Sequence, residues 1–185
     1  MYAGCGAMST GLCMGAAASD VNFVTRWAVD MNEDACESLC DNHPETQVRC
    51  MKAEDFLQLL IKWKDLCEKF SLLDADYSKT NVPTKNKEVE EIELETQTRR
   101  PYDGGDYEVE KIIGICYGNN PDTNEGPTAL HYKVKWKGWG SIWNSWEPAS
   151  NLENCQESIE DFVTAGYKSH ILPLPVSFYP FLLFN

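Results

Sequence analysis

The chain has 185 residues, enough for one domain or two small ones, and its 43% hydrophobic and 24% charged residues are ordinary for globular protein. Its formal net charge is −13, and the acidic residues are spread along the whole chain. No segment therefore carries the basic surface that is typical of direct nucleic-acid binding. An acidic surface instead suits a basic partner, or serves solubility alone.

Residues 1–70 predict alternating helices and strands. A glycine-rich turn in "YAGCGAMSTGLCMGAAAS" leads into a helix of small residues, and "NFVTRWAV" predicts a strand that ends at Asp30. Asn32 fits the N-cap of a short helix in "NEDACESLCDN", and "QVRC" predicts a second strand. Apolar residues then recur at three- and four-residue steps, which predicts an amphipathic helix with one face made of Phe56, Leu59, Leu60, Trp63, Cys67 and Phe70. This order is typical of the start of a Rossmann-like sheet.

The cysteines do not form a recognisable metal motif. Most of the 8 cysteines fall within residues 1–70, among apolar neighbours, and there is no CxxC pair. The nearest arrangement to a metal site is Cys36, Cys40 and His43, for which no fourth ligand is evident. We therefore favour buried, reduced thiols over zinc, and a reducing compartment.

Residues 71–105 differ from the segments on either side. Their clustered charges and weak apolar periodicity predict a linker that is largely disordered. From residue 106, "YEVEKIIGICYG" and "LHYKVKW" alternate as strands, and the second pattern places His131 on the face opposite Tyr132 and Val134. "NCQESIEDFVTAGY" predicts a helix, in which Asn154 and Glu157 have the spacing of a capping box.

Four tryptophans lie close together in "YKVKWKGWGSIWNSWEP". Their spacing alone fits one stripe of an amphipathic helix. However, Gly138 and Gly140 interrupt the run, Pro148 ends it, and a strand pattern precedes it. We therefore predict a strand, a tight turn and another strand.

Residues 106–166 resemble a chromodomain, on the strength of "YEVEKIIGI", "YKVKWKGWGSIWNSWEPASNL" and the acidic helix that follows. The resemblance implies an α+β fold of three antiparallel strands with a C-terminal helix, and an aromatic cage for methylated lysine formed by Tyr107, Trp136 and Trp139. A methylated ammonium group is attracted to ring faces. Trp146 matches the buried structural tryptophan of the family. Trp143 sits where many chromodomains have an acidic residue at the rim of the cage, which leaves the discrimination of methylation states open.

The family's peptide ligand lies as an additional strand. By resemblance it would contact Glu108 and Val109 on one side, and Glu147, Asn151 and Leu152 on the other. For Glu108 a purely solvated role is an equally good interpretation. The implied partner is a methylated histone-three tail, which implies chromatin association and a nuclear location.

Residues 1–70 resemble the first three motifs of DNA cytosine-5 methyltransferases, in "YAGCGAMSTGL", "WAVDMNEDACESLCDNHPET" and "KAEDFLQLL". This implies an α/β, partial Rossmann-like segment that binds S-adenosylmethionine. Gly4 and Gly6 would admit the amino-acid end of the cofactor, and Asp30 would bind the ribose, although it could instead cap a helix. The remaining implied cofactor contacts are Tyr2, Met31, Asp55 and Phe56.

The combination of the two segments resembles the plant chromomethylases, in which intact enzymes read histone-three lysine-9 methylation and methylate cytosine in non-CG contexts. Within residues 167–185, "GYKSHILPLP" resembles the return to the catalytic domain, and the apolar tail matches nothing familiar. The tail is too short and too rich in proline for a membrane span. The "PPCQ" and "ENV" motifs are absent, so we assign no catalytic residue and expect a truncated chromomethylase that transfers no methyl group by itself. The alternatives are a stand-alone histone reader or a regulatory short form.

Overall fold

A computed structural model describes residues 3–73 and 107–174. Predictions for Tyr2, for residues 74–105 of the linker and for the tail from residue 175 lie outside the described residues. The described part of the chain forms two compact units. One comprises residues 3–64 and 169–174, and the other comprises residues 65–73 and 107–168.

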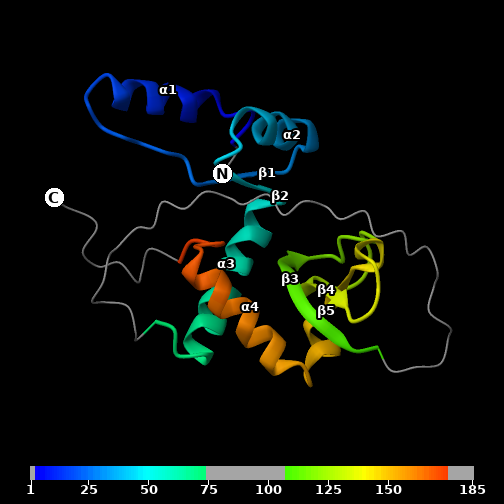
Figure 1. Ribbon diagram of the computed structural model, residues 1–185. Helices are drawn as coiled ribbons and strands as arrows, with labels where there is room; N and C mark the ends of the chain where they lie inside the picture. The colour runs from blue at the N-terminus through cyan, green and yellow to red at the C-terminus, as the bar shows by residue number, and fades with distance from the viewer. Residues whose placement is uncertain (1–2, 74–106, 175–185) are drawn as a thin grey trace. The chain divides into compact units, whose positions relative to one another are not determined.

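The first unit is built around a pair of parallel strands (Figure 1). Its elements are α1 (Ala7–Ala17), β1 (Trp27–Asp30), α2 (Glu33–Asn42), β2 (Gln47–Cys50) and the first part of α3 (Ala53–Lys69). β1 pairs with β2 from Trp27↔Gln47 to Asp30↔Cys50, and α2 connects the two strands and packs on them. The predicted order of elements is confirmed, as is the N-cap, because Asn32 Oδ1 accepts a hydrogen bond of 2.9 Å from Ala35 N.

Two predictions for this unit hold only in part. The strand expected from "NFVTRWAV" ends at Asp30 as predicted but begins only at Trp27, although Arg26 O still accepts Gln47 N over 2.8 Å. The early cysteines are not uniformly buried either: Cys36 is buried, whereas three are exposed, namely Cys5, Cys40 and Cys50. The exposed cysteines lie in the turn before α1, in the last turn of α2 and at the end of β2, and element ends are less covered than their middles.

The amphipathic pattern of α3 correctly predicts its buried face. Leu59, Trp63 and Cys67 are each 0% exposed. Their spacing of four residues brings them to one side of the helix. The helix begins in the first unit and ends in the second.

The second unit contains a three-stranded antiparallel sheet in the order β3-β4-β5 (Figure 1). Its strands are β3 (Val109–Gly118), β4 (Ala129–Trp136) and β5 (Ser145–Pro148), and α4 (Gln156–Lys168) packs on β3. Two short 3-10 helices, η1 (Ser141–Trp143) and η2 (Ala149–Leu152), flank β5. The predicted three strands and C-terminal helix are confirmed, and so is the strand–turn–strand interpretation of the tryptophan segment.

The core formed by the sheet, η2 and α4 is aliphatic with one tyrosine: its most buried apolar members are Ile112, Ile115, Tyr132, Val134, Leu152, Ile159 and Val163. The prediction of a capping box at Asn154 and Glu157 is wrong. α4 begins at Gln156, so Cys155, not Asn154, occupies the position before its first residue.

β3 carries register irregularities between Val109 and Lys111 and between Ile112 and Gly114. Such bulges bend a strand and increase its twist.

His131 is buried within the sheet, whereas Trp146, which was expected in the buried core, is only half-buried. His131 is only 3% exposed, and its Nδ1 donates to Ala129 O over 3.0 Å, so the buried ring keeps a hydrogen-bond partner. Trp146 is half-buried and not part of the deep core. Its ring lies over Gly114, where an added Cβ would come within 3.2 Å of the indole. The ammonium group of Lys133 lies 5.7 Å from the centroid of the same ring.

Candidate functional site

Three aromatic side chains meet where β3 begins and β4 ends, and we call Tyr107, Trp136 and Trp139 the three-ring cluster. The centroid of the Tyr107 ring lies 5.7 Å from that of Trp136 at 63°, and 5.4 Å from that of Trp139 at 55°. The antiparallel register explains the meeting, since Val109 pairs with Trp136 and Tyr107 therefore lies beside the end of β4. The structure thus brings together the three residues that the sequence assigns to one cage.

A tight turn carries the two tryptophans of the cluster. Trp139 N donates to Trp136 O over 3.2 Å, and Gly138 adopts a φ of +77°, which residues with a side chain rarely adopt. The ammonium group of Lys135 donates to Trp136 O over 3.0 Å and to Trp139 O over 2.5 Å. It also pairs with the Glu110 carboxylate over 2.9 Å, so one cation joins both ends of the turn to β3.

A chain of hydrogen bonds fixes the indole of Trp136. Trp136 Nε1 donates to Ser145 Oγ over 3.0 Å, and this hydroxyl donates to Glu147 Oε1 over 2.7 Å. The other carboxylate oxygen of Glu147 accepts from Asn151 Nδ2 over 3.2 Å. Glu147 and Asn151 are predicted peptide contacts, but in this structure they hold each other and orient the ring of Trp136.

The other predicted peptide contacts divide into two groups. Glu108 is exposed, forms an ion pair of 2.7 Å with Lys137, and accepts Lys137 N at its main-chain oxygen over 3.0 Å. Val109 is half-buried at the start of β3, an edge strand. Leu152, however, is only 2% exposed, so its side chain belongs to the core and is not available to a peptide.

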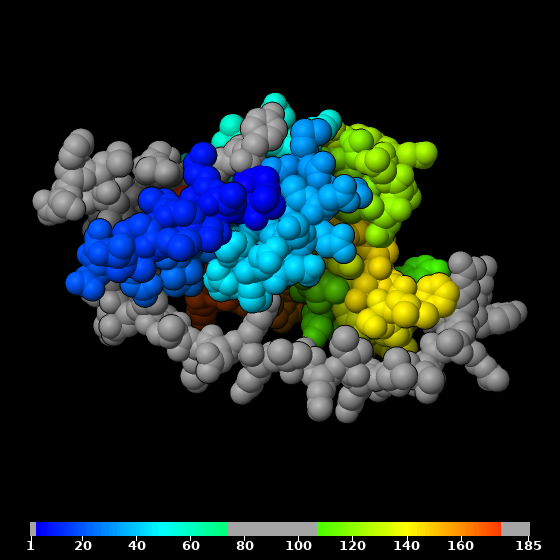
Figure 2. Space-filling view, turned by 90° about the horizontal axis from the view of Figure 1, so that it is seen from above, coloured from blue at the N-terminus to red at the C-terminus, as the bar shows by residue number. Residues whose placement is uncertain are grey.

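The three-ring cluster is accessible to ligand. The side chain of Tyr107 is 62% exposed, and both indoles are half-buried. The segment around residues 135–145 forms part of the molecular surface and is visible in yellow in Figure 2. Half-buried indoles capped by an exposed phenol leave ring surface that a cation can reach.

Trp143, which the resemblance places at the rim of the cage, contacts one ring of the cluster. The centroid of the Trp143 ring lies 6.0 Å from that of Trp139, and the two planes are nearly perpendicular at 88°. η1 produces this contact by bringing the chain back after the turn. The signal in the sequence is the close spacing of the four tryptophans.

In the first unit, Asp30 and Gly4 are in direct contact. Asp30 is 6% exposed at the end of β1, where its carboxylate accepts Gly4 N over 2.8 Å and Asn32 N over 3.0 Å. The N–H groups of Asn32 and then Gly4 hold the pKa of Asp30 below its usual value. Gly4 and Gly6 both have a positive φ, of +55° and +87°.

The other predicted cofactor contacts lie on the segments around the same strand ends. Met31 follows Asp30 directly and is 58% exposed. Asp55 and Phe56 are half-buried in the first turn of α3. The chain that leads into α3 is held near β1, because Met51 N donates to Asp30 O over 2.8 Å.

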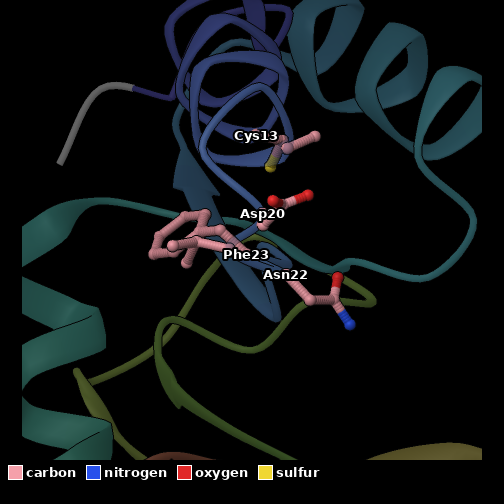
Figure 3. A pocket seen from close by; sticks show the side chains of 6 residues that line it. Cys13, Asp20, Asn22 and Phe23 are labelled. Atoms are coloured by element: carbon pink, nitrogen blue, oxygen red, sulfur yellow. The ribbon is translucent and has the colours of Figure 1, made fainter.

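A separate hollow of about 310 Å³ lies at the end of α1 and is lined by Cys13, Ala17, Asp20, Val21, Asn22 and Phe23. Figure 3 shows the Cys13 and Asp20 side chains at this hollow, with Phe23 beside them. None of its lining residues belongs to the predicted cofactor contacts, and its open, partly apolar surface holds no pair of groups arranged for chemistry.

Within residues 3–73 and 107–174, no three His, Cys, Asp or Glu side chains gather as metal ligands would. The same described ranges contain no helix with the length and apolar character that crossing a bilayer requires.

Comparison with known proteins agrees with the geometry. Residues 107–165 match the Chromo (CHRromatin Organisation MOdifier) domain. Over 182 residues the chain is 48% identical to CMT1 of Arabidopsis thaliana, which covers 97% of this chain and 23% of that protein. It is 47% identical over 177 residues to the DNA (cytosine-5)-methyltransferase CMT3 of the same plant, covering 95% of this chain and 21% of the relative.

Over nearly its whole length the chain is thus similar to chromomethylases. A further relative, the DNA (cytosine-5)-methyltransferase CMT1 of Oryza sativa subsp. japonica, is 42% identical over 175 residues, which are 95% of this chain and 16% of that protein. The chain therefore spans less than a quarter of the length of these chromomethylases. The match covers both described units, so the relationship does not depend on the chromodomain alone.

Proposed function

We propose that this chain supplies the histone-reading part of a chromomethylase. Its chromodomain binds a methylated lysine of the histone-three tail, and in the complete protein this binding directs cytosine methylation of DNA, in non-CG contexts, to chromatin in the nucleus. The observation that carries the proposal is the three-ring cluster, with centroids 5.4 and 5.7 Å apart around an exposed Tyr107.

The physical basis is the chemistry of a methylated ammonium group. It has fewer N–H donors and more apolar surface than the ammonium of lysine, so it leaves water at lower cost. Each ring face then attracts the cation by about 0.5–2 kcal/mol. The net charge of −13 favours a basic tail over other peptides. β3 is an edge strand on which a peptide can add as a strand, beside Glu108 and Val109.

Calorimetric titration of the full chain with histone-three tail peptides, unmodified or methylated at lysine 9, tests the proposal. Tyr107→Ala and Trp136→Ala should each weaken binding of the methylated peptide by about 2- to 30-fold. Ile113→Ala is the matched control, because Ile113 is 39% exposed on the same strand and lies outside the cluster. Equal affinity of the intact chain for methylated and unmodified peptides would refute the proposal.

We also propose that the first unit contributes to a site for S-adenosylmethionine. The residues fit this group: Asp30 and Gly4 meet at the carboxyl ends of two parallel strands, where ligands bind in α/β sheets. Each carboxylate oxygen of Asp30 accepts one main-chain N–H, which leaves a lone pair on each for a ribose hydroxyl. Met31, Asp55 and Phe56 would lie along the adenine.

When bound, the cofactor supplies the methyl group, and we assign no residue of this chain to the transfer itself. The full chain should therefore transfer no methyl group to DNA. Incorporation of labelled methyl groups above a heat-killed control would contradict this. Loss of cofactor binding in Asp30→Ala, measured by calorimetry, tests the site separately from the reaction.

A further inference from the structure

We propose that Cys36 and Cys50 form a peroxide-sensitive pair of thiols that is converted reversibly into a disulfide bond. The pair is a site of covalent modification in the first unit, and its chemistry is independent of the histone-reading function proposed above. Two observations carry the proposal. The two thiols meet at the carboxyl ends of β1 and β2, and they differ sharply in their access to solvent.

The parallel pairing of the strands brings the two cysteines together. Cys50 is the register partner of Asp30, and Cys36 lies in the first turn of α2, which connects the two strands and packs on them (Figure 1). Asp30 O accepts the Cys36 thiol over 3.5 Å and also accepts Met51 N, the N–H that follows Cys50, over 2.8 Å. A hydrogen bond also joins the thiols of Cys36 and Cys50. The two sulfur atoms are therefore direct neighbours, although they come from different elements.

The two thiols differ in what can reach them. Cys50 is exposed at the end of β2, whereas Cys36 is buried, with only 6% exposure. Burial, and then the adjacent Cys50 thiol, raise the pKa of Cys36 to about 12, so at neutral pH this thiol stays protonated and reacts slowly with solutes. Cys50 is thus the sulfur that meets an oxidant, and Cys36 is the neighbour that resolves the oxidised sulfur. This division is typical of redox-sensitive cysteine pairs.

Metal binding explains the pair less well than thiol oxidation does. A structural zinc site needs four ligands around one ion. Within residues 3–73 and 107–174, no third His, Cys, Asp or Glu side chain joins the two thiols in the way that a metal site requires.

The reaction balances with hydrogen peroxide as the oxidant. The Cys50 sulfur attacks one peroxide oxygen, the O–O bond breaks, and the other oxygen leaves as water with the thiol proton, so that Cys50 becomes a sulfenic acid. The Cys36 sulfur then attacks the Cys50 sulfur, the S–O bond breaks, and the hydroxyl group leaves as water with the Cys36 proton. The two thiols lose two electrons in total, and one peroxide is reduced to two waters. A dithiol reductant reverses the change by thiol–disulfide exchange.

Peroxide treatment of the full chain tests the site. The reduced chain is exposed to hydrogen peroxide, the remaining thiols are blocked with iodoacetamide during denaturation, and unreduced peptides are mapped by mass. We expect a disulfide that joins the Cys36 and Cys50 peptides and that dithiothreitol cleaves. Cys50→Ser should slow the loss of the Cys36 thiol by about 10-fold or more, because the buried sulfur then lacks its oxidised neighbour. Cys40→Ser is the matched control: Cys40 is exposed on the same helix as Cys36, and its loss should leave the cross-link unchanged.

A second variant separates the two chemical steps. Cys36→Ala removes the resolving thiol, so the Cys50 sulfenic acid should persist and react with dimedone about 3-fold more than in the wild type, or more. If this variant fails to fold, Cys50→Ser at its exposed position still decides the question. The proposal is overturned if peroxide produces no cross-link between Cys36 and Cys50, if Cys36 pairs with Cys40 instead, or if Cys50→Ser leaves the oxidation of Cys36 unchanged.

Discussion

The hydroxyl of Ser145 joins the indole of Trp136 to the carboxylate of Glu147, and Ser145→Ala removes both hydrogen bonds. The N–H···O distance of 3.0 Å and the O–H···O distance of 2.7 Å are normal for strong bonds, the second one to a charged acceptor. Leaving a half-buried indole N–H without an acceptor costs about 1–2 kcal/mol. Since Trp136 is one of three rings, we expect the affinity for methylated peptide to fall by about 3- to 10-fold.

The assay is calorimetric titration of the full chain, combined with thermal unfolding to separate lost binding from lost folding. Ser145→Thr keeps a hydroxyl at the same position and should recover most of the affinity. Ser141→Ala, an exposed serine of η1, is the control that should behave as wild type. If Ser145→Ala binds methylated peptide as tightly as the wild type, the hydrogen-bond chain does not position the ring.

Two further predictions concern titration and reactivity. Burial raises the pKa of Tyr132 to about 12, so the unfolded chain loses this proton first and the free energy of unfolding should fall by about 2 kcal/mol between pH 10 and 12. Urea unfolding of Tyr132→Phe should lack this part of the decline, and an unchanged decline would contradict the assignment. Burial raises the pKa of Cys36 to about 12 and that of Cys67 to about 11. Iodoacetamide at pH 8 should therefore modify Cys36 and Cys67 far more slowly than the exposed Cys5, Cys40 and Cys50, as followed by peptide mass mapping. Equal rates of modification would contradict this prediction.

Local patterns in the sequence predict the elements well where one physical rule dominates. The four-residue spacing of Leu59, Trp63 and Cys67 predicts the buried face of α3, and all three are fully buried. Asn32 predicts the beginning of α2, because its side chain can accept a main-chain N–H that the helix leaves unpaired. Gly138 and Pro148 rule out a tryptophan-striped helix, and the strand–turn–strand arrangement is observed.

The failures arise where tertiary contacts outweigh the local pattern. Strict alternation places His131 on the face opposite Tyr132 and Val134 but does not show how well that face is covered. The residue lies in the central strand, where its ring nitrogen donates to Ala129 O. Trp146 is large and apolar, yet its indole packs on Gly114 and does not enter the deep core. The side chain of Leu152 does the opposite and enters the core. Spacing alone does not tell which side of a short sheet the chain will cover.

For the candidate site, the sequence predicts the rings but not what holds them. Ser145 and Lys135 carry no signal in isolation, because their roles depend on which atoms the turn brings within hydrogen-bond distance. The same holds for Glu110, whose partner lies on the neighbouring strand. The contact between Trp139 and Trp143 likewise depends on η1, which the sequence does not predict.

This distribution of roles bears on the energetics of the proposed binding. A ring that becomes ordered only when the ligand binds lowers the affinity, because the loss of side-chain entropy opposes binding. Here Lys135 fixes both carbonyls of the turn that carries the two indoles, and Ser145 fixes the orientation of Trp136. Tyr107, at 62% exposure, is the one ring of the three-ring cluster that remains largely open to solvent. The two indoles should therefore be ordered before the peptide arrives, and the ordering cost of binding should fall mainly on Tyr107 and on the peptide itself.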